Sequence, residues 1–252
     1  MWTAPALASE SRPWSGDLWR VVESQSHFNT LKLVDTVEEQ ALLETELDSS
    51  KPAIPTSCAG LDYLLATPFR YAPYPNGSRF RRARQRDGCF YAGERVETAI
   101  AEEAFYRLLF FLDAPGTILP ANPQERTAFS VPAATDRVID LTTPPLDRDR
   151  AIWEHPTSYV PCQALADAAR EAQVEAIRYR SVRDPAGGAN IALLTPAAFR
   201  RKRPVALQSW RLFLRAATVQ AVREMPRLTL EFPFSIWRAD PRIPDRLGNP
   251  AR

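Results

Sequence analysis

The sequence predicts a single α+β domain of 252 residues. Hydrophobic residues make up 45% of the chain, which is enough for a sizeable buried core at this length. The segments Val96 to Leu112 and Ser158 to Gln173 have the apolar spacing of helices, and shorter apolar runs around them are typical of strands. Because no internal repeat or linker divides the chain, helices and strands are expected to share one core.

The two ends of the chain differ in composition from its middle. Residues 1 to 16 are rich in Ser, Pro and Ala and are expected to form a flexible lead-in. Residues 17 to 237 are expected to form the folded domain, and the Pro- and Arg-rich residues 238 to 252 a loose tail.

The elements before the long helix are expected in the following order. A strand covers Leu18 to Val22, and a helix covers Asp35 to Leu47 with Asp35 or Thr36 as its cap. Residues 48 to 78 are dense in Pro and Gly and are expected to carry short helices or part of a binding surface. Cys89 to Tyr91 is expected to be a buried strand.

The second half of the chain is expected to consist mostly of strands, with Ser158 as the cap of the second clear helix. The expected strands are Ala128 to Pro132, Arg137 to Leu141, Ala176 to Val182, Asn190 to Leu194, Val205 to Trp210, Ala217 to Arg223 and Leu228 to Phe232.

Charge and cysteine usage exclude several classes of protein. A formal net charge of only +2 argues against a general nucleic-acid-binding surface. The three cysteines are widely spaced and accompanied by only two histidines, so neither a disulfide framework nor a metal site is expected. The chain has no long apolar run and no signal-like start, which predicts a soluble cytoplasmic protein without membrane contact.

One candidate for chemistry is Glu102, in the helix predicted over Val96 to Leu112. It lies three or four positions from Ala99, Phe105 and Tyr106, and therefore at the apolar edge of the helix. A carboxylate there is either paired with arginine or active in chemistry. A solvated helix face is the alternative interpretation, because two further glutamates lie nearby.

A second candidate is the arginine cluster in the stretch SRFRRARQR. If this run is extended, Arg79 and Arg81 share one face, so one or two arginines can reach a pocket. A guanidinium binds phosphate with two parallel hydrogen bonds, which favours an anionic ligand. An exposed loop and a nucleic-acid contact are the alternatives.

A third candidate lies in AIRYRSVRDPAGGANIALL, where Tyr179 and Ser181 share one face of a strand that ends in a Pro/Gly-rich turn. Ser181 has neither a GxSxG elbow nor a paired histidine, which argues against a serine nucleophile, and a structural hydroxyl is the alternative. The chain has no GxGxxG or Walker sequence, so neither a Rossmann redox site nor a P-loop is supported.

Together these stretches resemble the RES domain family, which is named for an arginine, a glutamate and a serine. The resemblance extends from Trp19 to Trp210, and its pieces occur in the order of the family. The pieces are Trp19-Arg20, GSRF at 77–80, CFYAGERVETAIAE at 89–102, YVPCQALADAAR at 159–170 and YRSVRDPAGGANIAL at 179–193.

The resemblance implies a RES-like catalytic domain over residues 17–237, with an ADP-ribosyltransferase-like fold of mixed sheets flanked by helices. It implies cleavage of the nicotinamide N-glycosidic bond of NAD+, which is consumed as substrate, with no retained cofactor and with inorganic phosphate as a candidate co-substrate. It also implies the toxin of a toxin–antitoxin pair, bound by a helix-turn-helix antitoxin, through which alone it would contact DNA. A homo-oligomer is compatible with this assignment.

By motif, the resemblance implies a role for each candidate side chain. Glu102 would stabilise the cationic sugar, and Arg79 and Arg20 would hold the diphosphate. Tyr91 would stack on nicotinamide or orient the ribose, and Ser181 would bind a ribose hydroxyl or the carboxylate. The further substrate-binding residues that it implies are Trp19, Arg81, Tyr179 and Asn190.

This sequence departs from the family pattern at two places. Phe80-Arg81 stands where shorter members have Trp-Asn, and Trp19 where Tyr is common. ADP-ribosyl transfer to a macromolecule and a catalytically degenerate antitoxin-binding module remain alternative functions.

Overall fold

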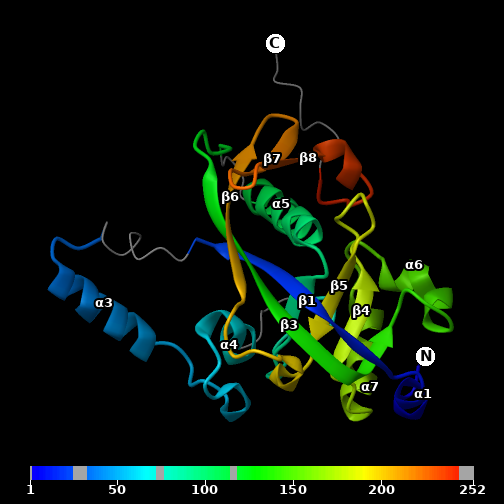
Figure 1. The fold of residues 1–252 in the computed structure, drawn as a ribbon. Coiled ribbons are helices and arrows are strands. Elements are labelled where there is room, and N and C mark those ends of the chain that lie inside the picture. Colours follow the sequence, from blue (N-terminus) through cyan, green and yellow to red (C-terminus); the bar gives the residue numbers. More distant parts are fainter. Residues whose placement is uncertain (1, 25–32, 72–76, 114–117, 244–252) are drawn as a thin grey trace.

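The computed structural model of the chain describes residues 2–24, 33–71, 77–113 and 118–243. These residues form an eight-stranded mixed sheet in the order β1-β2-β5-β4-β3-β6-β7-β8, flanked by helices (Figure 1). The α+β class predicted from the sequence is confirmed. The strands are β1 (Arg12–Glu23), β2 (Phe90–Gly93), β3 (Gln124–Asp140), β4 (Ala176–Arg180), β5 (Ala189–Leu193), β6 (Ala206–Leu214), β7 (Thr218–Arg223) and β8 (Leu228–Pro233).

An additional pairing between β1 and β3 closes part of the sheet into a ring. β1 runs antiparallel to β3 from Arg12 opposite Val138 to Glu23 opposite Arg126, while β2, β5 and β4 complete the circuit. Inward-facing side chains from all of these strands form one buried cluster, which includes Leu18, Phe90 and Ile191. The ring is therefore a small filled barrel, with side chains alternating between its interior and its outer surface.

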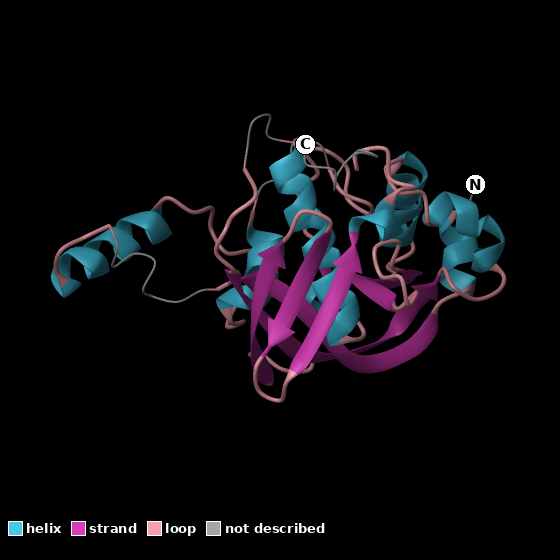
Figure 2. Cartoon of the chain, turned by 90° about the horizontal axis from the view of Figure 1, so that it is seen from above, coloured by secondary structure: helices cyan, strands magenta, loops and turns pink. Residues whose placement is uncertain are grey.

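The helices other than α3 cover the outer surface of the ring and one of its ends. They are α1 (Ala4–Ser9), α3 (Val37–Ser49), α4 (Tyr63–Arg70), α5 (Val96–Leu112), α6 (Arg150–Trp153) and α7 (Val160–Glu171). Leu65, Ala66 and Phe69 of α4 join the cluster inside the ring. By contrast, α3 extends away from the sheet (Figures 1 and 2). Its exposed side chains include Leu42.

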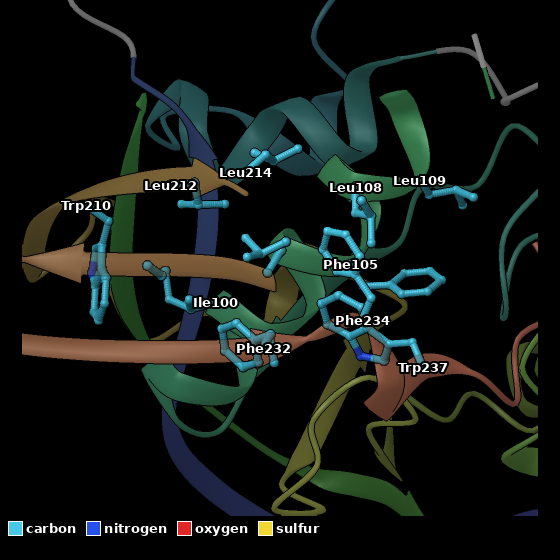
Figure 3. Close-up of a cluster of buried hydrophobic side chains, with 14 of the residues drawn as sticks. Ile100, Phe105, Leu108, Leu109, Trp210, Leu212, Leu214, Phe232, Phe234 and Trp237 are labelled. Atoms are coloured by element: carbon cyan, nitrogen blue, oxygen red, sulfur yellow. The ribbon is translucent and has the colours of Figure 1, made fainter. Parts of the chain in front are cut away.

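Two hydrophobic clusters lie on the outer surface of the ring. One joins α5 to β6, β7, β8 and the following turn, and it includes Phe105, Trp210 and Trp237 (Figure 3). The other joins α7 and α1 to the outer sides of β4 and β5. The helix predicted at Val96 to Leu112 is confirmed, and its first turn packs on Gly93, where a Cβ would lie only 2.9 Å from the carbonyl oxygen of Arg95.

Several predicted elements differ from the structure. The strands expected at 128–132 and 137–141 form the single strand β3, because the chain stays extended where it changes partner. Helix α7 begins at Val160 after Tyr159, without a side-chain cap, so Ser158 does not cap it. Thr36 does cap α3, since its hydroxyl accepts a hydrogen bond from the Glu39 amide at 3.1 Å.

The two ends of the chain also differ from the expected organisation. Residues 4–16 are not a flexible lead-in but form α1 and the start of β1, and the Leu7 side chain is completely buried. In the expected loose tail, Asp240 and Ile243 are buried, whereas residues 244–252 lie outside the described part of the chain. Amino-acid composition did not predict the order of residues 4–16 and 238–243, because these segments are held by contacts with distant parts of the chain.

Leu7→Ala is therefore expected to lower the free energy of unfolding by about 2–5 kcal/mol, because it opens a cavity between α1 and α7. Ser9→Ala, at an exposed position of the same helix, should change it by less than about 0.5 kcal/mol. Chemical denaturation of both variants measures the difference. Equal stability of the two variants would show that α1 is not part of the core.

Candidate active site

Glu102 lies on the second turn of α5, above the ends of β4 and β5. Its Oε1 accepts one hydrogen bond from Ser181 Oγ and one from Asn190 Nδ2, each at 2.7 Å. Both donors are buried. Within the described part of the chain Oε2 accepts no hydrogen bond, so this oxygen is the one that can face a ligand.

A tight turn fixes the direction of the Ser181 hydroxyl. Ser181 Oγ accepts hydrogen bonds from the amides of Arg183 and Asp184, each at 3.1 Å, so its own proton points to Glu102. Asp184 Oδ2 in turn accepts from Thr98 Oγ1 on α5 at 2.8 Å. A Cβ on Gly188 would lie 2.1 Å from that same Thr98 oxygen, so the turn requires glycine there.

A row of residues across the outer surface of the ring forms the floor beneath Glu102. Trp19 lies opposite Gly93, Gly93 opposite Asn190, and Asn190 opposite Tyr179. The Tyr179 ring is buried against Phe80 with 4.9 Å between centroids. Burial, followed by the nearby Glu102 charge, raises the pKa of Tyr179 well above its usual value, so its hydroxyl stays protonated.

The arginine cluster begins in a turn and not in an extended run. The Ser78 amide donates to the Arg81 carbonyl oxygen at 2.7 Å, and Gly77 adopts a φ of 67°. The alternation predicted for an extended run is therefore wrong, and Phe80 is completely buried. Tyr91 holds this turn, since its hydroxyl accepts from the Phe80 amide at 2.9 Å and shares a hydrogen bond with Ser78 Oγ at 2.8 Å.

Arg79 is buried beside the site, between α6 and α7. Its Nη1 donates to the Trp153 carbonyl oxygen, and its guanidinium lies 4.7 Å from the centroid of the Tyr159 ring. Arg81 is also buried, but it donates to the carbonyl oxygens of Gln85 and Tyr71. Through these contacts Arg81 stabilises the loop in which it lies.

Arg20 projects from the opposite side of β1 to Trp19. Its Nη1 donates to the Tyr91 carbonyl oxygen at 2.8 Å, and its guanidinium lies 5.2 Å from the centroid of the Phe90 ring inside the ring of strands. It lines a cavity of about 450 Å³ that does not include Glu102. The structure thus joins Glu102, Ser181, Asn190 and Tyr179, with Arg79 and Tyr91 nearby, and it places Arg20 and Arg81 in other contacts.

Several side chains at the site were not singled out from the sequence. Tyr106 follows Glu102 by one helical turn, is 47% exposed, and lies beside Tyr159. Its spacing from Glu102 was visible in the sequence, but the contact with Tyr159 was not. Arg183, Asp240 and Arg242 also gather here, through contacts between segments distant in the chain.

The neighbouring carboxylate of Glu103 has a different environment from Glu102. It forms an ion pair with the buried guanidinium of Arg126, with 2.5 Å between Nε and Oε1. Burial raises the pKa of Glu103, and Arg126 opposes that effect. The interpretation as a solvated helix face is therefore wrong for Glu102 and Glu103, whereas the half-exposed Glu97 fits it.

The described residues contain no cluster of His, Cys, Asp or Glu that could hold a metal ion. Nor, among the same residues, does any helix combine the length and apolar character needed to cross a bilayer.

Comparisons with known proteins identify one family. The model of the RES domain matches residues 54–215, a range that includes Glu102, Ser181 and Asn190 but not Trp19 or Arg20. No curated protein matches the chain. Similar solved structures include the crystal structure of the M. tuberculosis MbcT–MbcA toxin–antitoxin complex, with 13% sequence identity and a TM-score of 0.47 over 82% of this chain and 90% of that one.

Ser181→Ala is expected to lower the free energy of unfolding by about 1–3 kcal/mol, because it leaves the buried amide of Arg183 and the partly buried amide of Asp184 without their acceptor. Ser158→Ala provides the matched control, since that serine is exposed and caps no helix. Thermal unfolding of both variants measures the effect. A Ser181→Ala protein as stable as the parent would contradict the hydrogen bonds assigned to this turn.

Proposed function

The chain belongs to the RES domain family, and on that premise we propose that it degrades NAD+ by cleaving the bond between nicotinamide and ribose. The observation that carries the proposal is the Glu102 carboxylate, which two buried donors hold by one oxygen. A carboxylate fixed in this way is suited to stabilising positive charge on a sugar bound beside it.

The chemistry requires a fixed negative charge. When the N-glycosidic bond breaks, its electron pair leaves with nicotinamide, and the ribose develops an oxocarbenium-like positive charge. A carboxylate whose position is set before the reaction stabilises this charge without reorganisation in the transition state. The oxygen of phosphate or water then adds to the sugar carbon. NAD+ is consumed in this scheme and does not act as a retained cofactor.

Aromatic side chains around Glu102 supply contacts for the substrate. Tyr179 forms part of the floor, and Tyr106 and Tyr159 lie together on the side of α5 that carries Glu102. Flat rings suit contact with nicotinamide or with the apolar face of ribose. Tyr91 supports the same floor indirectly, because its hydroxyl holds the turn that carries Phe80.

We further propose, from the family alone, that the enzyme acts in the cytoplasm as a toxin restrained by a helix-turn-helix antitoxin. The solved MbcT–MbcA structure is itself a toxin–antitoxin complex, which is a property of that protein. ADP-ribosyl transfer to a macromolecule is the alternative reaction, because another nucleophile can capture the same cationic sugar. Labelled NAD+ separates the reactions, since transfer leaves the label on a macromolecule and cleavage leaves it in small products.

Glu102→Gln is expected to lower the rate of nicotinamide release by about two to three orders of magnitude while NAD+ binding persists. The glutamine oxygen can still accept the bonds from Ser181 and Asn190, so stability should change by about 1 kcal/mol or less. The assay is nicotinamide release, with circular dichroism to verify folding.

Glu97→Gln is the matched control, because Glu97 lies on the same helix in a half-exposed ion pair with Arg95. It should retain the parent rate. A Glu102→Gln protein that releases nicotinamide at the parent rate would show that Glu102 has no role in the reaction. A parent protein that releases no nicotinamide would favour a catalytically degenerate module.

Arg79→Lys is expected to lower kcat/KM for NAD+ by a factor that corresponds to about 1.5–3 kcal/mol. The reason is that an ammonium cannot reproduce the planar contacts to Trp153 and Tyr159. Arg86→Lys, at an exposed position of the same arginine cluster, should leave kcat/KM unchanged. Steady-state kinetics with NAD+ compare the two. Parent-like kinetics for Arg79→Lys would exclude a role for this guanidinium.

A further inference from the structure

The C-terminal segment, residues 234–243, lies beyond the residues matched by the family and packs against α5. Trp237 and Phe234 belong to the hydrophobic cluster around α5 (Figure 3). The ring centroids of Trp237 and Phe105 are 5.3 Å apart, and Phe105 follows Glu102 by three positions on α5. The segment is therefore held against α5 within one helical turn of the carboxylate.

Arg183 connects this segment to the turn that holds Ser181. Its carbonyl oxygen accepts from Trp237 Nε1 at 2.9 Å, and its Nη1 lies 2.8 Å from Asp240 Oδ2. Its guanidinium also lies 3.8 Å from the centroid of the Phe105 ring. Both side chains of the ion pair are almost completely buried, with 2% exposure for Arg183 and 1% for Asp240.

Asp240 binds a second guanidinium, that of Arg242. Arg242 Nη2 lies 2.8 Å from Asp240 Oδ2, and Arg242 Nε donates to Asp240 Oδ1 at 2.9 Å. The Arg242 guanidinium lies 5.5 Å from the centroid of the Phe105 ring, and its side chain is 32% exposed. The single negative charge of Asp240 therefore pairs with two guanidinium groups, so the three side chains together carry a net charge of about +1. Of the two arginines, only Arg242 is partly exposed.

The other arginines described above are less suited to a ligand at Glu102. Arg79 and Arg81 are buried and donate to carbonyl oxygens of the chain. Arg20 lines a different cavity, on the other side of β1. Arg242 differs from them because its side chain is partly exposed and interacts with Tyr106, one helical turn after Glu102, and because Asp240 holds the planar group in place.

We propose that Arg242 is a substrate-binding residue that holds the diphosphate of the dinucleotide beside Glu102. A guanidinium forms two parallel hydrogen bonds to phosphate oxygens, and a pre-oriented one loses little freedom on binding. Asp240 and Phe105 provide that orientation. The proposal rests on the proposed function for its substrate, and it adds to the site a segment outside the family match.

The test measures NAD+ kinetics and calorimetric binding of ADP-ribose for the parent and for Arg242→Gln. We expect KM to rise and ADP-ribose affinity to fall, each by about 10- to 100-fold, because one charge-assisted contact is lost. We expect kcat and the melting temperature to stay close to the parent values, because Asp240 keeps Arg183 as a partner. For Arg242→Lys we expect a KM and an ADP-ribose affinity between those of the parent and of Arg242→Gln.

Arg238→Gln is the matched control, since Arg238 is exposed on the same segment and should bind and turn over substrate like the parent. Unchanged KM and ADP-ribose affinity in Arg242→Gln would overturn the proposal while leaving NAD+ cleavage intact. A fall in kcat and melting temperature at constant KM would also overturn it, by showing a structural role. Arg242-dependent ADP-ribose binding by a parent protein that cleaves no NAD+ would support the binding role and refute the proposed reaction.

Discussion

The pairing of β1 with β3 is the constraint on which the rest of the structure depends. It closes the sheet into a ring, so that the two faces of each strand, between which side chains alternate, become an interior and an outer surface. The register then fixes the outer row that runs from Trp19 through Gly93 and Asn190 to Tyr179. Since Gly93 has no side chain, α5 can rest on this row, and Glu102 reaches the amide of Asn190.

Positioning at the site thus comes from backbone geometry as much as from side chains. The Ser181 hydroxyl is oriented by two amides of its own turn, and the turn is tied to α5 through Asp184 and Thr98. The carboxylate and its donors therefore cannot move independently. This rigidity suits electrostatic stabilisation, which depends on groups that are already in place when charge develops.

Local patterns in the sequence were sufficient for the parts of the fold that depend on near neighbours. The helix over Val96 to Leu112 and the strands from β4 onward have periodicities that their own residues specify. Glu102, Ser181 and Asn190 could be named from motifs, but their convergence on one oxygen could not. That convergence depends on the registers of β4 and β5.

What could not be predicted depends on distant partners. The turn at Ser78 to Arg81 is held by the Tyr91 hydroxyl and by the φ of Gly77, neither of which an alternating pattern of arginines reveals. The resemblance assigned both Trp19 and Arg20 to the substrate, and the structure places them on opposite sides of β1. The order of residues 4–16 and 238–243 likewise depends on contacts with β3, α7 and Arg183.

Ring closure also has a consequence for how the chain reaches its native state. The closing strand β1 is synthesised first, yet its partner β3 comes far later, with Arg12 opposite Val138. Until β3 emerges, most backbone groups of β1 lack a partner strand, because β2 lies opposite β1 only at Trp19 and Gly93. Contacts so distant along the chain slow folding, because a large loop must be ordered before they form. The carboxylate site can therefore assemble only after most of the chain has been made.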